Sequence, residues 1–184
     1  YVNGYNLCPS SFTHELLHIY IKDKKINIAN ELEKHITENH TLRTIFSLPL
    51  RTHIGNCLEH IKMLPIYLNL GFPNEKFLSD YNESKMDSLT ILQIKTTYKN
   101  YNIYNKEVVD FYIGKFFAMK ACNNNSFNYF NYYSELENID SELFYSLNNF
   151  WENWINIIDS RNYKPILEKF IEDLKNWTKN KKFI

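Results

Sequence analysis

The spacing of apolar residues is the property of this sequence that most restricts its fold. In most long segments the apolar side chains recur every three to four residues, which is the period of an α-helix packed on one face. The 184 residues include only four Gly, too few for the many tight turns of an all-β protein. We therefore predict an all-α protein, a compact bundle of about seven helices that forms a single domain over residues 1–184.

Local start signals and apolar stripes place the expected helices. Ser11 is the expected N-cap of the first helix. The segment 123–138 has the weakest periodicity and is expected to be a loop or a broken helix. The first helix is expected to bury Phe12, Leu16, Ile19 and Tyr20, a short helix is expected near 41–46, and a longer one should run from Thr52 to Leu70 with a kink at Pro65 and with Ile54, Leu58, Ile61 and Leu68 on one face. Two further helices are expected, one that starts at Ser84 and carries Met86, Leu89, Leu92 and Ile94, and one that carries Val108, Tyr112, Phe116 and Met119. The last two should start at Asp140 or Ser141, with Leu143, Leu147, Trp151, Trp154 and Ile158, and near Pro165, which suits the first turn, with Ile166, Phe170, Leu174 and Trp177.

Charge and cysteine content argue against several broad classes of protein. Lys plus Arg and Asp plus Glu both number 21, so the zero net charge gives no electrostatic reason to expect nucleic acid or an anionic membrane. Three Cys without a C-x-x-C pair exclude a zinc ribbon and argue against a disulfide framework. No run approaches the roughly 18 to 20 apolar residues of a membrane span. Because the chain starts at Tyr1 without an apolar leader, we expect a trimmed fragment whose targeting region lies outside this sequence.

The strongest metal-binding motif is the segment His14-Glu15-Leu16-Leu17-His18, which matches H-E-x-x-H. On a helix, residues four apart share a face, so His14 and His18 could both bind zinc with Glu15 as general base. The extended zinc-protease motif has Gly and His where this chain has Ile21 and Lys24. A zinc hydrolase is therefore kept as an alternative, beside two ordinary histidines on a partly exposed helix face.

The remaining histidines have simpler explanations. His53 and His60 are seven residues apart, so two helical turns separate them, too far for one metal ion. These two, with His35 and His40, are expected to be surface residues or hydrogen-bonded core residues. The three Trp residues have helical spacing and are expected in the core, rather than stacked on bases or on a tetrapyrrole.

The C-terminal segment carries a small group of cations at Lys175, Lys179, Lys181 and Lys182. Cations at this end of a helix complement the helix dipole, so a solvated terminus explains them. Nucleic acid is kept only as a weaker alternative partner, because P-loop, zinc-finger and RNP signatures are all absent from the sequence.

The order of the expected helices and several strings of residues resemble the heme oxygenase family. The resemblance is closest to the plant and algal plastid branch and to the divergent members of apicomplexan plastids. It implies a heme oxygenase-like helical bundle located in a plastid-type organelle, the apicoplast. The first helix, around Phe12, Glu15, Leu16 and Ile21-Lys22, resembles the proximal helix of the family, and residues 42–70 resemble its next pair of helices. The string FYIGKFFAMKA at 111–121 is similar to the distal-helix sequence F-Y-x-x-Y-F-A-H-S-A-G-G. Residues 143–177 resemble the closing helices.

Positions that carry the chemistry of this family differ in the present chain. The resemblance places Lys24 where the family has the His that binds heme iron, and a Lys ammonium has no lone pair for iron. Cys122 and Asn123 occupy the Gly-Gly pair that lets the distal helix approach heme. Met119 takes the place of an Asp that orders water in the animal-type enzymes. The resemblance therefore implies a degenerate protein for which no heme or other cofactor is expected.

The expected function follows from these losses. We expect a non-enzymatic interaction or maintenance protein whose partner is an unidentified protein of the organelle. The aromatic residues Phe127, Tyr129, Phe130, Tyr132 and Tyr133 are the candidate contact surface, unless they pack over the distal helix instead. Two enzymatic alternatives remain. One is an active, divergent heme oxygenase that converts heme to biliverdin, iron and carbon monoxide with ferredoxin electrons. The other is the zinc hydrolase on the HELLH motif.

Overall fold

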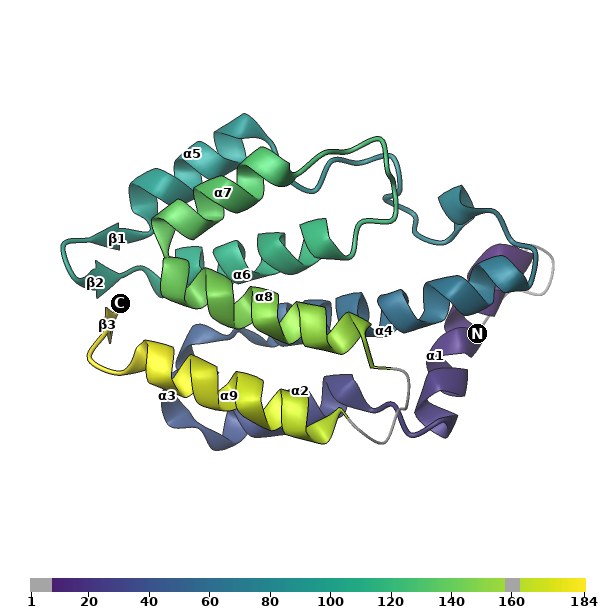
Figure 1. Ribbon diagram of the computed structural model, residues 1–184, viewed down its shortest axis with the longest axis horizontal. Coiled ribbons are helices and arrows are strands. Elements are labelled where there is room, and N and C mark those ends of the chain that lie inside the picture. The colour runs from purple at the N-terminus through teal and green to yellow at the C-terminus, as the bar shows by residue number, and fades with distance from the viewer. Residues whose placement is uncertain (1–7, 158–162) are drawn as a thin grey trace.

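Helices make up most of the chain that the computed structural model describes, residues 8–157 and 163–184 (Figure 1). The all-α prediction is confirmed, with nine α-helices in these two ranges instead of about seven. No helix within them is long and apolar enough to cross a membrane. The helices are α1 (Pro9–Asp23), α2 (Ile28–Glu38), α3 (His40–Ile45), α4 (Leu48–Asn69), the 3₁₀ turn η1 (Asn74–Lys76), α5 (Ser88–Thr97), α6 (Lys106–Lys120), α7 (Phe130–Ile139), α8 (Ser141–Ile155) and α9 (Lys164–Thr178).

A small three-stranded sheet attaches the end of the chain to the α5–α6 connection. Strand β1 (Lys99–Asn100) pairs antiparallel with β2 (Ile103–Tyr104), and β2 pairs parallel with β3 (Lys182–Phe183). These strands therefore fix the position of the residues that follow α9.

The helices form three approximate layers around α4. Figure 1 shows α5 and α7 on one side, α4, α6 and α8 in the middle, and α2, α3 and α9 on the other side. The long helix α4 contacts α1, α2, α6 and α8. Helix α1 lies at one end of the bundle and packs against α4. Helix α4 therefore links α1 to the other helices of the bundle.

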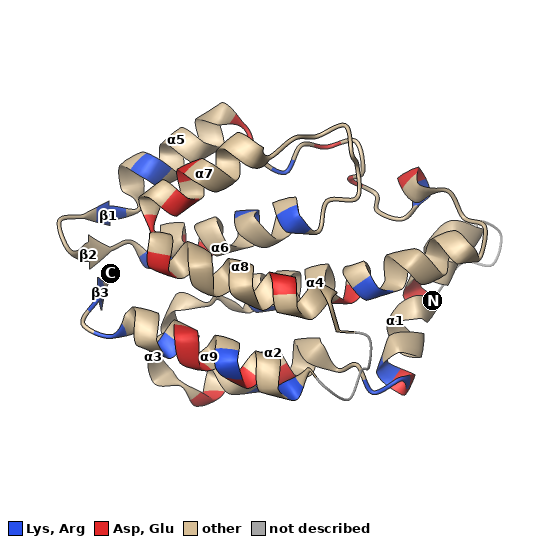
Figure 2. Cartoon of the chain, viewed as in Figure 1, with Lys and Arg blue, Asp and Glu red and all other residues tan. Residues whose placement is uncertain are grey.

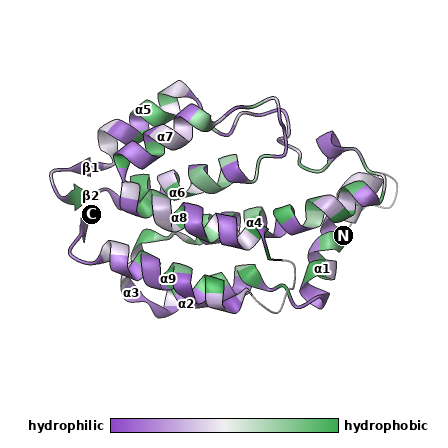
Figure 3. Cartoon of the chain, in the orientation of Figure 1, coloured by the Kyte–Doolittle hydropathy of each residue, from purple (hydrophilic) through white to green (hydrophobic). Residues whose placement is uncertain are grey.

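The buried apolar residues form two separate cores. The larger core takes side chains from α2 through α9, and Figure 3 shows the hydrophobic residues recurring along these helices. The smaller core lies beneath α1 and contains Leu17, Ile21, Met63, Tyr67 and Phe77. Helix α1 is therefore held by a small apolar cluster, formed with the second half of α4 and the segment after η1.

Helices α2 and α4 approach each other closely at Gly55. A Cβ atom placed on Gly55 would lie 2.6 Å from the Cβ of Ala29. Glycine at this position therefore permits the contact, since any larger residue would push the helices apart.

A buried carboxylate joins three helices at the opposite end from α1. Asp140, one of the two predicted caps, is the N-cap of α8 and accepts a hydrogen bond from the Leu143 backbone N–H. Its other oxygen accepts from the Tyr98 hydroxyl and from the Trp177 indole N–H, each at 3.0 Å. The cap therefore also fixes α5 and α9 against α8.

The prediction for α1 is wrong in its start and in its buried face. The helix begins at Pro9 with Cys8 as N-cap, so Ser11 lies inside it. Its buried residues are Ser10, Leu17 and Ile21. The helix has apolar residues on more than one side, and the side that meets α4 is the buried one. The residues predicted to be buried are exposed instead, at 48% for Phe12, 45% for Leu16, 65% for Ile19 and 45% for Tyr20.

The remaining helix predictions are partly confirmed. The expected helices near 41–46, after Asp140 and at Pro165 are present. Helix α2 is not among the predicted helices. Helix α7 covers the second part of the segment 123–138, which is predicted to be a loop or a broken helix, and it ends one residue beyond that segment. Helix α5 starts after Asp87, whose side chain accepts from the Thr90 N–H, rather than at Ser84. Helix α4 continues through Pro65. Most members of the expected apolar stripes after α1 are buried. The structure leaves three of them half-buried, Ile61, Val108 and Ile166, and three exposed, Leu68, Leu89 and Leu92. One member, Ile158, lies outside the described residues.

Candidate metal centre

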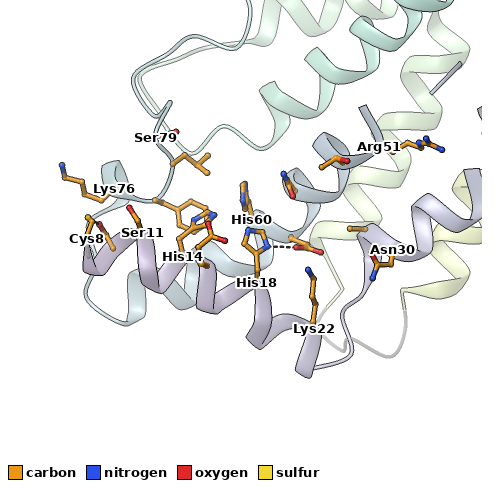
Figure 4. A pocket seen from close by; sticks show the side chains of 18 of the residues that line it. Cys8, Ser11, His14, His18, Lys22, Asn30, Arg51, His60, Lys76 and Ser79 are labelled. Carbon is orange, nitrogen blue, oxygen red and sulfur yellow. Dashed lines mark hydrogen bonds and ion pairs between the residues drawn. The ribbon is translucent and has the colours of Figure 1, made fainter. Parts of the chain in front are cut away.

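Three histidine rings from two helices meet above the smaller core. His14 and His18 project from α1, one turn apart, and His60 projects from α4 (Figure 4). One ligand atom from each ring can be chosen so that all three lie within 4.8 Å of one another. The ring centroids are 5.1 Å apart for His14–His18, 4.8 Å for His14–His60 and 5.3 Å for His18–His60. The three rings are therefore arranged as in a three-histidine metal site, but with their nitrogens farther apart than in the metal-bound state.

The crossing of α1 over α4 brings these rings together. Spacing of four residues puts His14 and His18 on one face of α1. The same side of α1 buries Leu17 and Ile21 against Met63 of α4, and His60 lies one turn before Met63. The apolar contact thus places the polar rings opposite each other at its edge.

A buried carboxylate orients one of the rings. Glu59 Oε2 lies 2.6 Å from His18 Nδ1, and the Glu59 side chain is only 2% exposed. With Nδ1 donating to this oxygen, Nε2 of His18 is the atom free to bind a metal. A carboxylate that accepts from the second nitrogen of a metal-bound histidine fixes its tautomer and raises its basicity. Glu59 therefore has the position of a supporting residue behind a ligand.

The environment keeps the rings of His14 and His60 in the form that a metal requires. Burial, then the neighbouring rings of His14 and His18, lower the pKa of His60 to about 3. Burial and the proximity of His18 also lower the pKa of His14, and Glu15 acts in the opposite direction. Since a metal binds only the neutral imidazole, His14 and His60 are ready to act as ligands at neutral pH.

Buried polar atoms around the rings have no partner within the described residues. Nδ1 of His14 is buried and makes no hydrogen bond there; the Phe77 backbone lies close enough to raise its pKa, but outside hydrogen-bond geometry. The second oxygen of Glu59, Oε1, is also buried and unpartnered. Unsatisfied buried polar atoms are uncommon in folded proteins and indicate a missing ligand or water.

The cluster opens onto a pocket of about 1050 Å³. The pocket lies between α1, the facing parts of α2 and α4, and the segment after η1. Figure 4 shows the three rings grouped together, with Lys76 and Lys22 farther out on either side of them. A metal held by the three rings would therefore be accessible from the pocket.

The donor set fits zinc. Zinc accepts imidazole nitrogen at about 2.0–2.1 Å in tetrahedral geometry, so two bound nitrogens lie about 3.4 Å apart. The nitrogens here lie within 4.8 Å, so they need to approach by at most about 1.4 Å. Rotation about χ2, a soft torsion in histidine, can supply a movement of this size. Three rings leave one of the four positions open, as in catalytic rather than structural zinc sites.

A histidine and a cysteine earlier on α4 have a structural role. His53 Nε2 lies 3.1 Å from the Gly114 carbonyl, and Cys57 Sγ lies 3.6 Å from the same nitrogen. Burial raises the pKa of Cys57 to about 12, so its thiol stays protonated. Of the two expected roles, surface or hydrogen-bonded core, His53 has the hydrogen bond and is half-buried. The same expectation does not include the approach of His60 to His14 and His18, because the spacing of two residues on α4 contains no information about α1.

The positions taken from the heme oxygenase resemblance do not line this pocket. Lys24 is exposed at the C-cap of α1, with its ammonium 5.3 Å from the centre of the Tyr20 ring. Met119 is buried in α6. Cys122 and Asn123 follow α6, where the Asn123 amide donates to Asn74 at 2.8 Å. The structure therefore places Lys24 in solvent and the other three positions around the end of α6.

The proposed aromatic contact surface is only partly exposed. Phe130 is 72% exposed, whereas Tyr129 is buried. Phe127, Tyr132 and Tyr133 are half-buried against the larger core. Packing within the bundle thus accounts for most of this segment.

The basic C-terminal group is divided among neighbouring side chains. Lys181 forms an ion pair with Glu142 at 2.7 Å and lies over the rings of Tyr104 and Trp177. Lys179 donates to Asn176. Figure 2 shows basic and acidic residues interspersed along the visible helices. This surface gives no added support to nucleic acid as a partner.

Comparison of the chain with protein-family models, with curated proteins and with solved structures finds no match.

Proposed function

We propose that this protein binds one transition-metal ion, zinc by its ligand chemistry, through His14, His18 and His60. The observation that carries the proposal is the convergence of three imidazoles within 4.8 Å, one of them held by the buried carboxylate of Glu59. Three nitrogen donors suit zinc, copper, nickel or iron, and do not suit magnesium or calcium.

The test is a metal titration of the purified chain. After chelation and dialysis, zinc content is measured by elemental analysis, and affinity by competition with a chromophoric chelator. We expect one zinc per chain. Two or more weakly bound ions per chain, or none, would contradict a defined centre.

Single-residue variants identify the ligands. His60→Ala should reduce zinc affinity at least tenfold, since it removes the ligand contributed by α4. His40→Ala is the matched control because His40 is exposed on the short helix α3 and outside the cluster. Circular dichroism of both variants checks that the helices are retained. Equal zinc affinity in the two variants would exclude His60 as a ligand.

We infer a second candidate function from the resemblance, a non-enzymatic heme oxygenase-like interaction protein of a plastid-type organelle. Its support is the mostly helical fold, together with Lys24, an exposed cation that cannot bind iron without losing its proton. Such a protein would bind an organellar protein partner and would not degrade heme.

Titration with hemin tests this second candidate. We expect no saturable low-micromolar complex in the Soret band. Formation of biliverdin after addition of reductant and oxygen would overturn it in favour of an active heme oxygenase. If hemin does bind, a Lys24→Ala variant with an unchanged signal would indicate nonspecific adsorption and leave the candidate standing.

A further inference from the structure

We infer that the three-histidine centre is hydrolytic, with Glu15 as the general base for a metal-bound water that attacks carboxylic esters or amides. This inference rests on the proposed metal binding and extends it to a reaction. Its first support is the open coordination position, since three protein ligands leave room for water on zinc. Its second support is the pocket of about 1050 Å³ that adjoins the ligands and admits a substrate.

Glu15 lies on the same side of α1 as the two ligands of that helix. At about 100° per residue, His18 lies about 40° around the helix from His14, and Glu15 about 100°. Glu15 is therefore only about 60° from His18 in helical angle. The side chain lines the pocket, and its charge acts on the ring of His14. These positions place a carboxylate in the pocket, on the side of α1 that carries His14 and His18.

The two carboxylates near the ligands have different environments and different roles. Glu59 is buried, and its Oε2 is bonded to His18, so it orients a ligand. Glu15 is exposed to the pocket, and none of the ion pairs or side-chain hydrogen bonds of the described residues engages it. A base that must accept a proton from water and later release it needs this accessibility. Glu15 is therefore the base, and Glu59 is a positioning residue.

The charges of the pocket favour a neutral carbonyl substrate. Its lining includes four carboxylates and three cationic side chains. A phosphate ester would need a cluster of positive side chains, which this balance does not provide. A neutral ester or amide needs only the metal to polarise its carbonyl oxygen. The carboxylates are Glu15, Glu33, Glu59 and Glu75, and the cations are Lys22, Arg51 and Lys76.

The reaction balances without any further reactant. Glu15 takes a proton from the metal-bound water, and the hydroxide oxygen forms a bond to the carbonyl carbon. The bond from that carbon to the leaving oxygen or nitrogen then breaks, and its electron pair stays with the leaving group. The proton held by Glu15 passes to the leaving group, which yields a carboxylic acid and an alcohol or amine.

The experiment measures hydrolysis of p-nitrophenyl acetate by the zinc-loaded full chain. We expect a rate at least tenfold above that of the same protein stripped of metal and above that of free zinc. Glu15→Gln should lower kcat by about 10²- to 10⁴-fold, the contribution typical of a general base, while zinc stoichiometry stays at one. Glu38→Gln is the matched control, since Glu38 is an exposed carboxylate on α2 that does not line the pocket.

The outcomes separate this inference from the proposed metal site. One bound zinc without hydrolysis above free zinc would overturn the hydrolytic role and leave the metal site intact. Full activity of Glu15→Gln would overturn the assignment of the base. Hydrolysis of p-nitrophenyl phosphate in preference to the acetate would overturn the substrate class. Failure of zinc to bind would overturn the proposed function itself.

Discussion

Replacement of Glu59 by Gln should separate metal affinity from protein stability. Glu59 Oε2 lies 2.6 Å from His18 Nδ1, and the side chain is almost fully buried. Glutamine has nearly the same shape and can still accept this hydrogen bond, but without a charge. Loss of a supporting carboxylate typically lowers metal affinity 10- to 100-fold, which is about 1.4–2.7 kcal/mol. We expect a loss of zinc affinity in this range.

The same change should leave the metal-free protein at least as stable. Oε1 of Glu59 is buried without a hydrogen bond among the described residues, so the wild type bears the cost of a partly unsatisfied buried carboxylate. A neutral amide reduces that cost. We expect the urea midpoint without zinc to stay the same or rise, and the midpoint with saturating zinc to fall relative to the zinc-loaded wild type.

Chelator competition and urea unfolding with and without zinc give the two quantities. Unchanged zinc affinity in Glu59→Gln would refute the role of Glu59 behind His18. An equal loss of stability with and without zinc would show that Glu59 is needed for folding rather than for orientation of the metal ligand. A Glu38→Gln control corrects for the general effect of removing one negative charge.

Three further predictions concern stability. Gly55→Ala should lower the free energy of unfolding by about 1–3 kcal/mol, because the new Cβ atom would lie 2.6 Å from the Cβ of Ala29. Adding Ala29→Gly to this variant should restore much of the lost stability. Additive effects of the two substitutions in a urea double-mutant cycle would contradict a contact between residues 55 and 29. The pKa of His60 is about 3 in the fold against about 6.5 in the unfolded chain, so the unfolded chain binds more protons between these values. The contribution of the neutral His60 ring to the free energy of unfolding is complete above pH 6.5. It is lost as the pH falls toward 3, by at most about 1.4 kcal/mol per pH unit. The urea unfolding midpoint of His60→Leu should therefore fall less steeply than that of the wild type as the pH is lowered. Parallel pH dependences of the two proteins would refute the attribution of this acid sensitivity to His60. Asp140→Ala should cost about 3–5 kcal/mol because it leaves the buried Tyr98 hydroxyl and two N–H donors unpartnered; a change in thermal unfolding midpoint of less than about 2 °C would contradict this estimate.

Local sequence signals correctly placed the starts of α8 and α9. Asp140 caps α8 by bonding to the N–H three residues later, a contact contained within one turn. Pro165 lies in the first turn of α9, as predicted, because its fixed φ suits that turn. The strong periodicity of α8 correctly predicted the burial of Trp151 and Trp154. Helix α7 was missed because its helical conformation is stabilised by contacts with α5 and α8.

Helix α1 shows what periodicity leaves undecided. Its sequence has apolar residues on more than one side, and both the predicted face and the observed face fit a helical repeat. The exposed Leu16 and the buried Leu17 are neighbours with the same chemistry. Contact with α4 decides which side is buried, and the α1 sequence alone does not contain the position of α4.

The candidate site divides in the same way. The sequence by itself determined that His14 and His18 share a helix face, because four residues make about one turn. Only the tertiary structure decided that His60 completes a three-nitrogen set and that Glu59, 41 residues beyond His18, holds one of its rings. The physical reason is the small apolar contact between α1 and α4. That contact fixes where the helices cross, and the crossing sets the distance between polar groups far apart along the chain.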